Sequence, residues 1–570
     1  MIACDLLFHN ARIVDVFRLR TFLGWACVAE GRFVAVEEGA PPRDLRAAQT
    51  VDVGGRYLAP GLVDAHMHIE SSLLTPRRFA EAVLPFGTTT VLADPHEVAN
   101  VAGVAGVRWM IAASRDLPLS VFIAIPSCVP ATSPEIEWTA AVFGAAEVRA
   151  LADDPAVIAL GEVMDYRGLL GQNERLPPMV RAAHEAGLLV EGHIPTLSGL
   201  ELSRYLAHGV FSDHTLTDPP KILEQLSKGV TVMLQTKSIT AENMAVLREL
   251  PDRANVLLVT DDIEPSLLGG GHLSRMVQLA VENGLPELEA WAAASVRPAR
   301  YLRMHDRGAI APWQRADCLI LDNLTAFPPR AVYVAGEQVA AEGVCRVDEW
   351  PELPPLPQFP HVPEPPSPEA LRLDGAARAE RVLANVVTLV TEHTTLTQLE
   401  RIPLTLRDGF PVFRDGDRLN LLAVHTRDGA RTMVGVIKNV HLERGAFASS
   451  LAHDSHNLLM IGRDPRSMLT AARAVHAMGG GVAVAEGETV AARLPLPLFG
   501  LLSDAPLADV QRDQGAVEDA LRRFGVRRQR PFLTLSIMAL SVSPYYKFTD
   551  RGVVDTERRA LLPPWEAADD

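Results

Sequence analysis

The sequence predicts an α/β fold: a (β/α)8 TIM-like barrel, a small composite β domain built from segments on both flanks of the barrel, and a C-terminal α+β domain. Three observations lead to this prediction. Short, nearly continuous apolar runs alternate with helical stretches over about 250 residues, the dimensions of such a barrel. Alternating strand-like runs precede and follow this region. A proline-rich stretch then separates it from a further region of mixed strands and helices.

The β domain is predicted from two separate segments. Residues 11–16 and 32–36 alternate apolar and polar side chains between turn signals, as strands with one buried face do. Strand-like runs return after the barrel, at 308–321 and 331–336. We expect these runs to pair with the N-terminal ones, so that residues 1–57 and 309–346 form one domain.

Eight buried strands are predicted in the barrel region, residues 58–308. They are Leu58–Ala65, Thr88–Ala93, Ser120–Ile125, Val157–Val163, Leu188–His193, Val210–His214, Thr231–Gln235 and Val256–Asp261. Thr75 and Pro76 read as an N-cap followed by proline at the first helical position. Four glycines stand between a helical run and the next strand, where a left-handed C-cap is expected: Gly87, Gly187, Gly209 and Gly229.

The C-terminal part begins after a linker. Proline is so frequent at 347–368 that neither a helix nor a central strand can form there. A second globular domain is predicted over 369–570. It contains strands at Leu419–Val424 and Thr432–Val440 and a helix at Ser467–Met478.

Composition excludes several classes of partner. The net charge of −16 disfavours nucleic acid and anionic membranes, which need a basic surface. No apolar stretch is long enough to cross a bilayer, and no signal-peptide core is visible. The cysteines are scattered and odd in number, without a C-x-x-C pair: Cys4, Cys27, Cys128, Cys318 and Cys345. This argues against disulfides and thiolate zinc sites and favours a cytoplasmic location.

Metal-ligand side chains lie at the predicted strand ends. His66 and His68 are two residues apart on a strand, so both point to the same side. Strands four, five, six and eight end in further imidazoles and carboxylates. The predicted metal ligands are therefore His66, His68, Glu162, His193, His214 and Asp261. Since the carboxyl ends of barrel strands converge, these side chains predict a site for divalent metal, most simply two ions.

The ligand set indicates hydrolysis. A divalent ion lowers the pKa of bound water towards about 7. Asp261 is placed to accept the water's proton and to pass it to the leaving group. His214 ligates metal or polarises the attacked centre, and Glu162 completes the expected catalytic residues. Asp262 is interpreted as structural.

Several segments resemble the adenine deaminase family of the amidohydrolase superfamily, and the resemblance spans nearly the whole chain. The most specific are Asp94-Pro95-His96-Glu97 and His453-Asp454-Ser455-His456-Asn457. The others are residues 66–76, 87–90, 126–132, 161–164, 444–450 and 531–536.

The resemblance implies hydrolytic deamination of adenine to hypoxanthine and ammonia. It implies two metal positions, with Mn²⁺ as the expected ion and Fe²⁺ or Zn²⁺ as alternatives, and a homo-oligomer. Glu162 occupies the place of the carbamylated lysine found in many superfamily relatives. Asp94 and Glu97 are expected to bind the purine ring or transfer a proton to it. The alternative for both is a helix N-terminal role, which suits acidic residues.

Two departures from the family pattern concern the substrate pocket. Thr215 stands where the family usually has an acidic residue, and 235–238 read Gln-Thr-Lys-Ser where the family tends towards Arg-x-Gly-Ser. Another aminopurine deaminase or a cyclic amidohydrolase is therefore the alternative. A non-catalytic relative would show degenerate ligands, and none is seen. A zinc-dependent nucleic-acid base deaminase would need a C-x-x-C, which is absent.

The His453-Asp454-Ser455-His456 motif invites a second metal-site interpretation. No further ligand cluster accompanies it in the sequence. We therefore expect a hydrogen-bonded loop that packs on the barrel mouth rather than a metal site.

Overall fold

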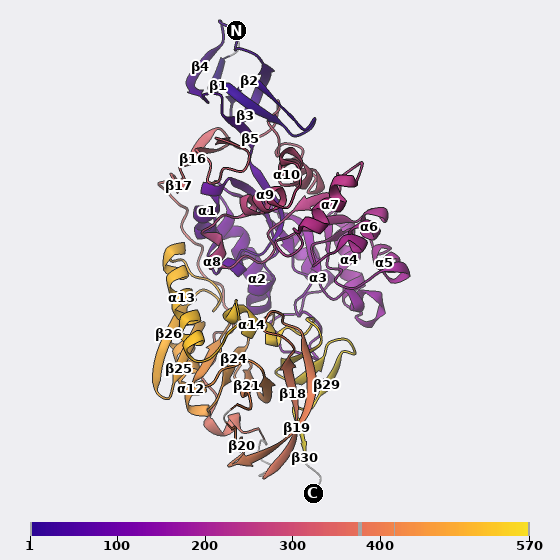
Figure 1. Ribbon diagram of the computed structural model, residues 1–570, viewed down its shortest axis with the longest axis vertical. Coiled ribbons are helices and arrows are strands. Elements are labelled where there is room, and N and C mark those ends of the chain that lie inside the picture. Colours follow the sequence, from indigo (N-terminus) through magenta and orange to yellow (C-terminus); the bar gives the residue numbers. More distant parts are fainter. Residues whose placement is uncertain (1–2, 374–378, 415, 568–570) are drawn as a thin grey trace. The chain divides into compact units, whose positions relative to one another are not determined.

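The computed structural model describes residues 3–373, 379–414 and 416–567 (Figure 1). The chain divides into two compact units. The first contains residues 1–94, 110–125 and 148–354. The second contains residues 95–109, 126–147 and 355–570.

The first unit contains a sheet drawn from both ends of the barrel sequence. Its strands are β1 (Ala3–Asp15), β2 (Arg20–Ala29), β3 (Arg32–Glu38), β4 (Arg46–Asp52), β5 (Tyr57–Pro60), β14 (Cys318–Leu321), β15 (Ala331–Val334), β16 (Glu337–Ala341) and β17 (Val344–Cys345). The order is β17-β16-β15-β14-β5-β1-β2-β3, with β4 beside β1. The antiparallel pairing of β14 with β5 joins the two segments. Figure 1 shows β1–β4 gathered at one end of this unit, away from the barrel helices α4–α7.

The predicted barrel is confirmed. Its parallel strands are β6 (Leu62–Met67), β7 (Thr88–Ala93), β8 (Ser120–Ile125), β9 (Val157–Val163), β10 (Leu189–Gly192), β11 (Ser212–Asp213), β12 (Thr231–Leu234) and β13 (Val256–Leu258). They run in two arcs, β10-β9-β8-β7-β6 and β11-β12-β13. A parallel bridge between Met67 and Asp261 connects β6 with the end of β13. The helices that alternate with these strands are α1 (Pro76–Val83), α3 (Ala145–Leu151), α4 (Leu176–Glu185), α5 (Gly199–Leu206), α6 (Pro219–Ser227), α7 (Ala241–Glu249), α8 (Pro265–Leu268), α9 (Leu273–Glu282), α10 (Glu287–Ala293) and α11 (Val296–Tyr301).

One strand prediction needs correction. The expected strand Leu58–Ala65 breaks at Gly61, so that β5 belongs to the composite sheet and β6 opens the barrel. A Cβ at Gly61 would lie 2.4 Å from Thr89 Oγ1, which explains why a residue without a side chain stands at the break. The residues predicted to begin and end helices are confirmed. Thr75 precedes α1, and the four predicted C-cap glycines have φ between 74° and 88°.

The second unit is built around a larger sheet. Its strands are β18 (Arg381–Leu389), β19 (Thr397–Arg407), β20 (Phe410–Pro411), β21 (Leu419–His425), β22 (Thr432–Lys438), β23 (Ala446–Ser449), β24 (Leu458–Gly462), β25 (Gly481–Glu486), β26 (Thr489–Pro495) and β30 (Trp565–Ala567). Helix α12 (Pro465–Ala477) contributes Met468, Ala472 and Val475 to its core. The remaining elements are α13 (Leu507–Arg523), α14 (Pro531–Ser536), β27 (Tyr546–Thr549), β28 (Gly552–Asp555) and β29 (Ala560–Leu562).

Two segments that follow barrel strands in the sequence belong to the second unit. Residues 95–109 form most of α2 (His96–Ser114), which kinks at Gly103. In the segment 126–147, Trp138 N donates to Asp550 Oδ1 at 2.6 Å, and Ile136 O accepts from Thr549 Oγ1 at 2.7 Å. These bonds attach the segment to the strands β27–β28.

The second half of the proline-rich stretch packs within the second unit. Val362 is buried in the unit's core, and its carbonyl oxygen lies 3.0 Å from His476 Nδ1. Arg427 donates to Pro360 O at 3.1 Å. The extended proline chain is thus held in place by side chains of the C-terminal region. None of the helices in the described ranges is long and apolar enough to cross a membrane.

Candidate active site

The six predicted ligands gather at the carboxyl end of the barrel in the first unit. His66 lies on β6 with His68 just after it, and Glu162 lies on β9. His193, His214 and Asp261 follow β10, β11 and β13. Parallel strands bring their carboxyl ends to the same face, so residues distant in sequence meet there.

Glu162 is the centre of this cluster. Its Oε2 lies 2.6 Å from His193 Nδ1 and 3.2 Å from His214 Nε2. Its Oε1 lies 3.4 Å from His68 Nε2. One buried carboxylate therefore faces three imidazoles.

Asp261 faces the histidine pair from the end of the neighbouring strand, β13. Its Oδ1 lies 3.6 Å from His68 Nε2 and 3.9 Å from His66 Nε2. Two overlapping groups each place their ligand atoms within 4.8 Å of one another, and both contain His66: the first adds Glu162 and His214, the second His68 and Asp261. Within the described ranges, the buried Nε2 of His66 has no hydrogen-bond partner, as a nitrogen directed at a cation would.

The protonation states of His66 and Glu162 suit metal binding. Burial holds the pKa of His66 well below its ordinary value, so this imidazole is neutral, the form that ligates metals. Burial acts to raise the pKa of Glu162, but His214 and His193 outweigh it and keep this carboxylate ionised. Asp94 O lies 3.0 Å from His68 Nδ1. Because a carbonyl only accepts, Nδ1 of His68 donates this hydrogen bond, so that Nε2 is the nitrogen the neutral ring would offer to a cation.

Glu191 is a site residue that the sequence reasoning did not select. Its Oε2 lies 3.6 Å from His66 Nδ1, and its Oε1 accepts from Tyr301 Oη. Burial raises the pKa of Glu191 to about 7. A carboxylate behind a ligating histidine orients the ring and increases its basicity. The signal was present, since Glu191 and His193 are two residues apart in the expected strand Leu188–His193 and so were expected to share a face.

Gln235 and Ser71 form hydrogen bonds with the two aspartates that follow β13. Gln235 Nε2 donates to Asp261 Oδ2 at 3.1 Å, so this departure from the family pattern contacts the expected proton acceptor. Asp262 Oδ1 accepts from Ser71 Oγ at 2.5 Å, in keeping with a structural role. Asp261 itself has φ 58°, a conformation that non-glycine residues rarely adopt.

Asp94 supports the backbone of Glu162. Its Oδ2 accepts from Glu162 N at 3.1 Å. A Cβ at Gly161 would lie 2.0 Å from that oxygen, so the close approach requires glycine. Glu97 belongs to the second unit, where its Oε1 lies 3.6 Å from His453 Nδ1.

Thr215, the other departure from the family pattern, forms hydrogen bonds with two charged side chains. It donates to Asp213 Oδ1 at 2.8 Å and accepts from Lys221 Nζ at 2.7 Å. Burial acts to raise the pKa of Asp213, but Lys221 outweighs it and keeps the pKa low. The threonine hydroxyl is thereby engaged with its own loop.

One expectation about the second unit is wrong. For the His453-Asp454-Ser455-His456 motif, what is wrong is the absence of further ligands: His96 and Cys128 lie beside Asp454, while the expected hydrogen-bonded loop stays a prediction. They come from segments more than 300 residues away, which is why the sequence did not reveal them.

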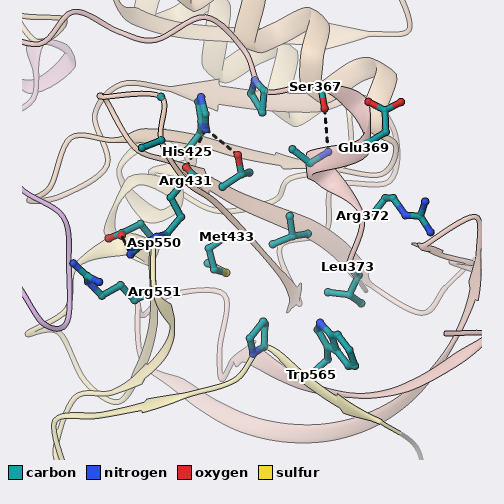
Figure 2. A pocket seen from close by; sticks show the side chains of 17 residues that line it. Ser367, Glu369, Arg372, Leu373, His425, Arg431, Met433, Asp550, Arg551 and Trp565 are labelled. Carbon is teal, nitrogen blue, oxygen red and sulfur yellow. Dashed lines mark hydrogen bonds and ion pairs between the residues drawn. The ribbon is translucent and has the colours of Figure 1, made fainter. Parts of the chain in front are cut away.

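A separate cavity of about 670 Å³ lies in the second unit (Figure 2). Arg372, Arg431, Arg551 and Trp565 are among its lining residues. Arg431 is paired with Asp550 at 3.0 Å. None of the six predicted ligands lines it, so this cavity is distinct from the barrel cluster.

Comparisons with known proteins find matches in both units. Residues 57–339 match the amidohydrolase family, and residues 394–560 match the adenine deaminase C-terminal domain. The adenine deaminase of Nitratidesulfovibrio vulgaris is 39% identical over 561 residues, covering 97% of this chain and 95% of the relative. That of Halalkalibacterium halodurans is 35% identical, covering 97% and 94%. A crystal structure of a zinc-bound adenosine deaminase from Xanthomonas campestris has a TM-score of 0.46 at 17% identity, covering 61% of this chain and 95% of that one.

Proposed function

This chain belongs to the adenine deaminase family, and from that membership we propose how it acts: it hydrolyses adenine at C6 and releases hypoxanthine and ammonia. The observation that carries the proposal is the gathering of four imidazoles with the carboxylates of Glu162 and Asp261. Such a set combines metal ligation with proton transfer in one place.

We propose a divalent metal pair, and the residues that would hold it are His66, His68, Glu162, His193, His214 and Asp261. We propose Mn²⁺ as the ion, as membership of the family implies, with Fe²⁺ and Zn²⁺ as alternatives; carboxylate oxygen suits Mn²⁺, and imidazole nitrogen suits Fe²⁺ and Zn²⁺. The buried, unbonded Nε2 of His66 and the two overlapping groups of ligand atoms, both drawn from the described residues, support the fit. When bound, the metal supplies Lewis acidity that makes water nucleophilic at neutral pH.

Asp261 is proposed as the proton carrier. It accepts a proton as water adds to C6 and then delivers that proton to the departing amino group, so that water and adenine give hypoxanthine and ammonia. Gln235 would hold its carboxylate in position, and the positive φ at Asp261 is the kind of strain found at functional sites. His214 would ligate metal or polarise C6, and Glu162 would orient the three imidazoles that face it.

Asp94 and Glu97 are proposed to contact the purine or protonate a ring nitrogen. Support for Asp94 is its burial next to the Glu162 backbone. Glu97 stands in the first turn of α2, where the helix N-terminal alternative also applies.

The proposed proton carrier is tested with neighbouring carboxylates. Asp261→Asn should lower kcat for ammonia release from adenine by about 10²–10⁴-fold, since general acid–base catalysis contributes that much. Asp262→Asn, the matched control, should leave kcat within a few fold. Unchanged turnover in Asp261→Asn would remove this mechanism.

A second candidate rests on Thr215 and Gln235, which depart from the family pattern and whose side chains are hydrogen-bonded to Asp213 and Asp261. It is deamination of another aminopurine, or hydrolysis of a cyclic amide. A panel of adenine, substituted aminopurines and hydantoin-like rings decides between these. Turnover of cyclic amides alone would exclude adenine deamination.

A cytoplasmic homo-oligomer acting on a free purine, without nucleic-acid or membrane partners, completes the proposal. The acidic net charge of −16 supports the absence of nucleic-acid and anionic-membrane partners. Sedimentation of the purified chain at several concentrations, together with cell fractionation, tests it. A monomer at all concentrations would contradict the oligomer.

A further inference from the structure

The second unit contains a cluster of metal-ligand side chains that the proposed reaction does not use. His96 is the first residue of α2, Cys128 lies in the loop after β8, and Asp454 lies in the loop between β23 and β24. One ligand atom from each lies within 4.8 Å of the other two, and all three residues are buried. Three segments of one unit thus bring a nitrogen, a sulfur and an oxygen together.

The surroundings add a further imidazole. Asp454 Oδ1 lies 3.7 Å from His96 Nε2 and 3.3 Å from His453 Nδ1. Burial acts to raise the pKa of Asp454, but hydrogen bonding to His453 and His96 outweighs it, so the carboxylate is ionised. His453 therefore stands beside the cluster as a fourth candidate ligand.

Unsatisfied buried atoms form an independent observation. In the part of the chain that the structure describes, Asp454 Oδ2 is buried without a hydrogen-bond partner, and so are both ring nitrogens of His456. The His456 ring centre lies 5.9 Å from that of His453. A buried polar atom without a partner is destabilising, and native proteins usually satisfy it with an ion or ordered water.

We propose that His96, Cys128 and Asp454 bind a zinc ion that joins these three segments of the second unit. Imidazole nitrogen, thiolate sulfur and carboxylate oxygen are all zinc ligands, and a tetrahedral site places its ligand atoms about 3.3–3.8 Å apart. Shifts of about 1 Å would close the observed cluster to that size. A thiolate and a carboxylate also neutralise the two charges of Zn²⁺, which a buried ion needs.

The site acts as a structural clamp. It connects the start of α2 and the loop after β8 to a loop of the C-terminal sheet, positions separated by more than 300 residues. Metal binding that requires all three segments adds its free energy to the folding of the unit. The competing explanation is an ion pair between His96 and Asp454 with a buried thiol beside it.

Sulfur makes the site distinguishable from the barrel cluster. Full-length protein loaded with Co²⁺ should show a thiolate-to-cobalt charge-transfer band in the near ultraviolet. The six proposed metal ligands in the barrel include no cysteine, so cobalt bound to them cannot produce this band. The band should fall to background in Cys128→Ser and stay unchanged in Cys345→Ser, a matched control at a partly exposed cysteine. Zinc content should fall by one equivalent per chain in Cys128→Ser alone.

Two results would contradict the proposed zinc site. One is the absence of the band in cobalt-loaded wild-type protein, which needs no variant and so does not depend on a variant folding. The other is an undiminished band in Cys128→Ser. Asp454→Asn, which keeps the size of the side chain, should weaken cobalt binding at least tenfold. Ammonia release from adenine is recorded on the same samples: active protein without the band rejects the clamp and leaves the deaminase proposal standing.

Discussion

Burial changes the pKa of two carboxyl groups in this protein. Burial raises the pKa of both Glu191 and Glu137 to about 7. Glu191 is held by Tyr301, while Glu137 accepts from Thr132 and Ser541, the latter at 2.7 Å. Both are therefore hydrogen-bonded carboxyl groups that become ionised only near neutral pH.

Glu191→Gln should weaken metal binding in the barrel about 10–100-fold, the usual effect of removing a carboxylate behind a ligating histidine. The amide keeps the size of the side chain but does not increase the basicity of His66. Competition with a chelator at fixed pH measures the affinity. Glu185→Gln, exposed at the end of α4, is the control and should have no effect. Equal affinities in all three proteins would refute this role.

Glu137→Gln should flatten the pH dependence of stability. Because the folded pKa lies above the unfolded value of 4.5, the stabilisation from Glu137 is complete below pH 4.5 and is lost as the pH rises through about 7. The loss amounts to about 3 kcal/mol. Urea midpoints of the second unit, followed from pH 5 to 7.5, should fall in wild type and change less in the variant. Glu135→Gln, an exposed neighbour whose pKa is lowered, should behave as wild type. Parallel curves for all three would contradict the assignment.

At the scale of elements, glycines decide where strands stop and how closely they approach. Gly61 ends β5 and allows β6 to begin in a different sheet. Gly161, within β9, leaves room for the Asp94 carboxylate against the backbone that carries Glu162. The position of Glu162, the proposed central ligand, thus depends on the absence of a side chain one residue earlier.

Gly161→Ala should therefore lower kcat/KM for adenine by about 10²-fold, the cost of misplacing a catalytic group by about 1 Å. The added Cβ would stand 2.0 Å from Asp94 Oδ2, so that either Asp94 or the end of β9 must move. Gly515→Ala on α13 meets nothing within 4 Å and serves as the control, with wild-type activity and a slightly more stable helix. Wild-type kcat/KM in Gly161→Ala would show that the close approach is dispensable.

At the scale of the whole molecule, the chain forms two units that do not follow the order of the sequence. Residues 95–109 and 126–147 belong with the C-terminal region, although barrel strands precede and follow them. The proline-rich stretch is likewise held within the second unit, through Val362 and through the bonds of Arg427. Arg427 is buried and donates to three backbone carbonyl groups, those of Pro360, His456 and Phe499.

Arg427→Leu should destabilise the second unit by several kcal/mol, at about 1–3 kcal/mol for each carbonyl left without a donor. It should also release the segment around Pro360 for proteolysis. Urea unfolding and limited digestion measure the two effects. Arg558→Leu, at a side chain that is 83% exposed, should change neither. Intact resistance to digestion in Arg427→Leu would show that other contacts hold the stretch.

Much of the fold could be predicted because its signals are local. Three barrel strands, β7, β8 and β9, have the predicted bounds, and the helix starts and glycine caps follow from rules that act over a few residues. The six candidate ligands were recognisable because strand ends converge in any parallel barrel. Glu191 and Tyr301 were missed, since their importance lies in contacts with residues 110 to 125 positions away.

The sequence by itself determined the barrel, the ligand types at its strand ends and the family, because apolar periodicity, side-chain chemistry and motifs are properties of neighbouring residues. Only the tertiary structure decided which side chains stand behind His66 and Asp261, which segments make up each unit, and that Cys128 and His96 meet Asp454. The physical reason is that such contacts depend on where distant segments pack, which the free energy of the whole fold decides and no local pattern records.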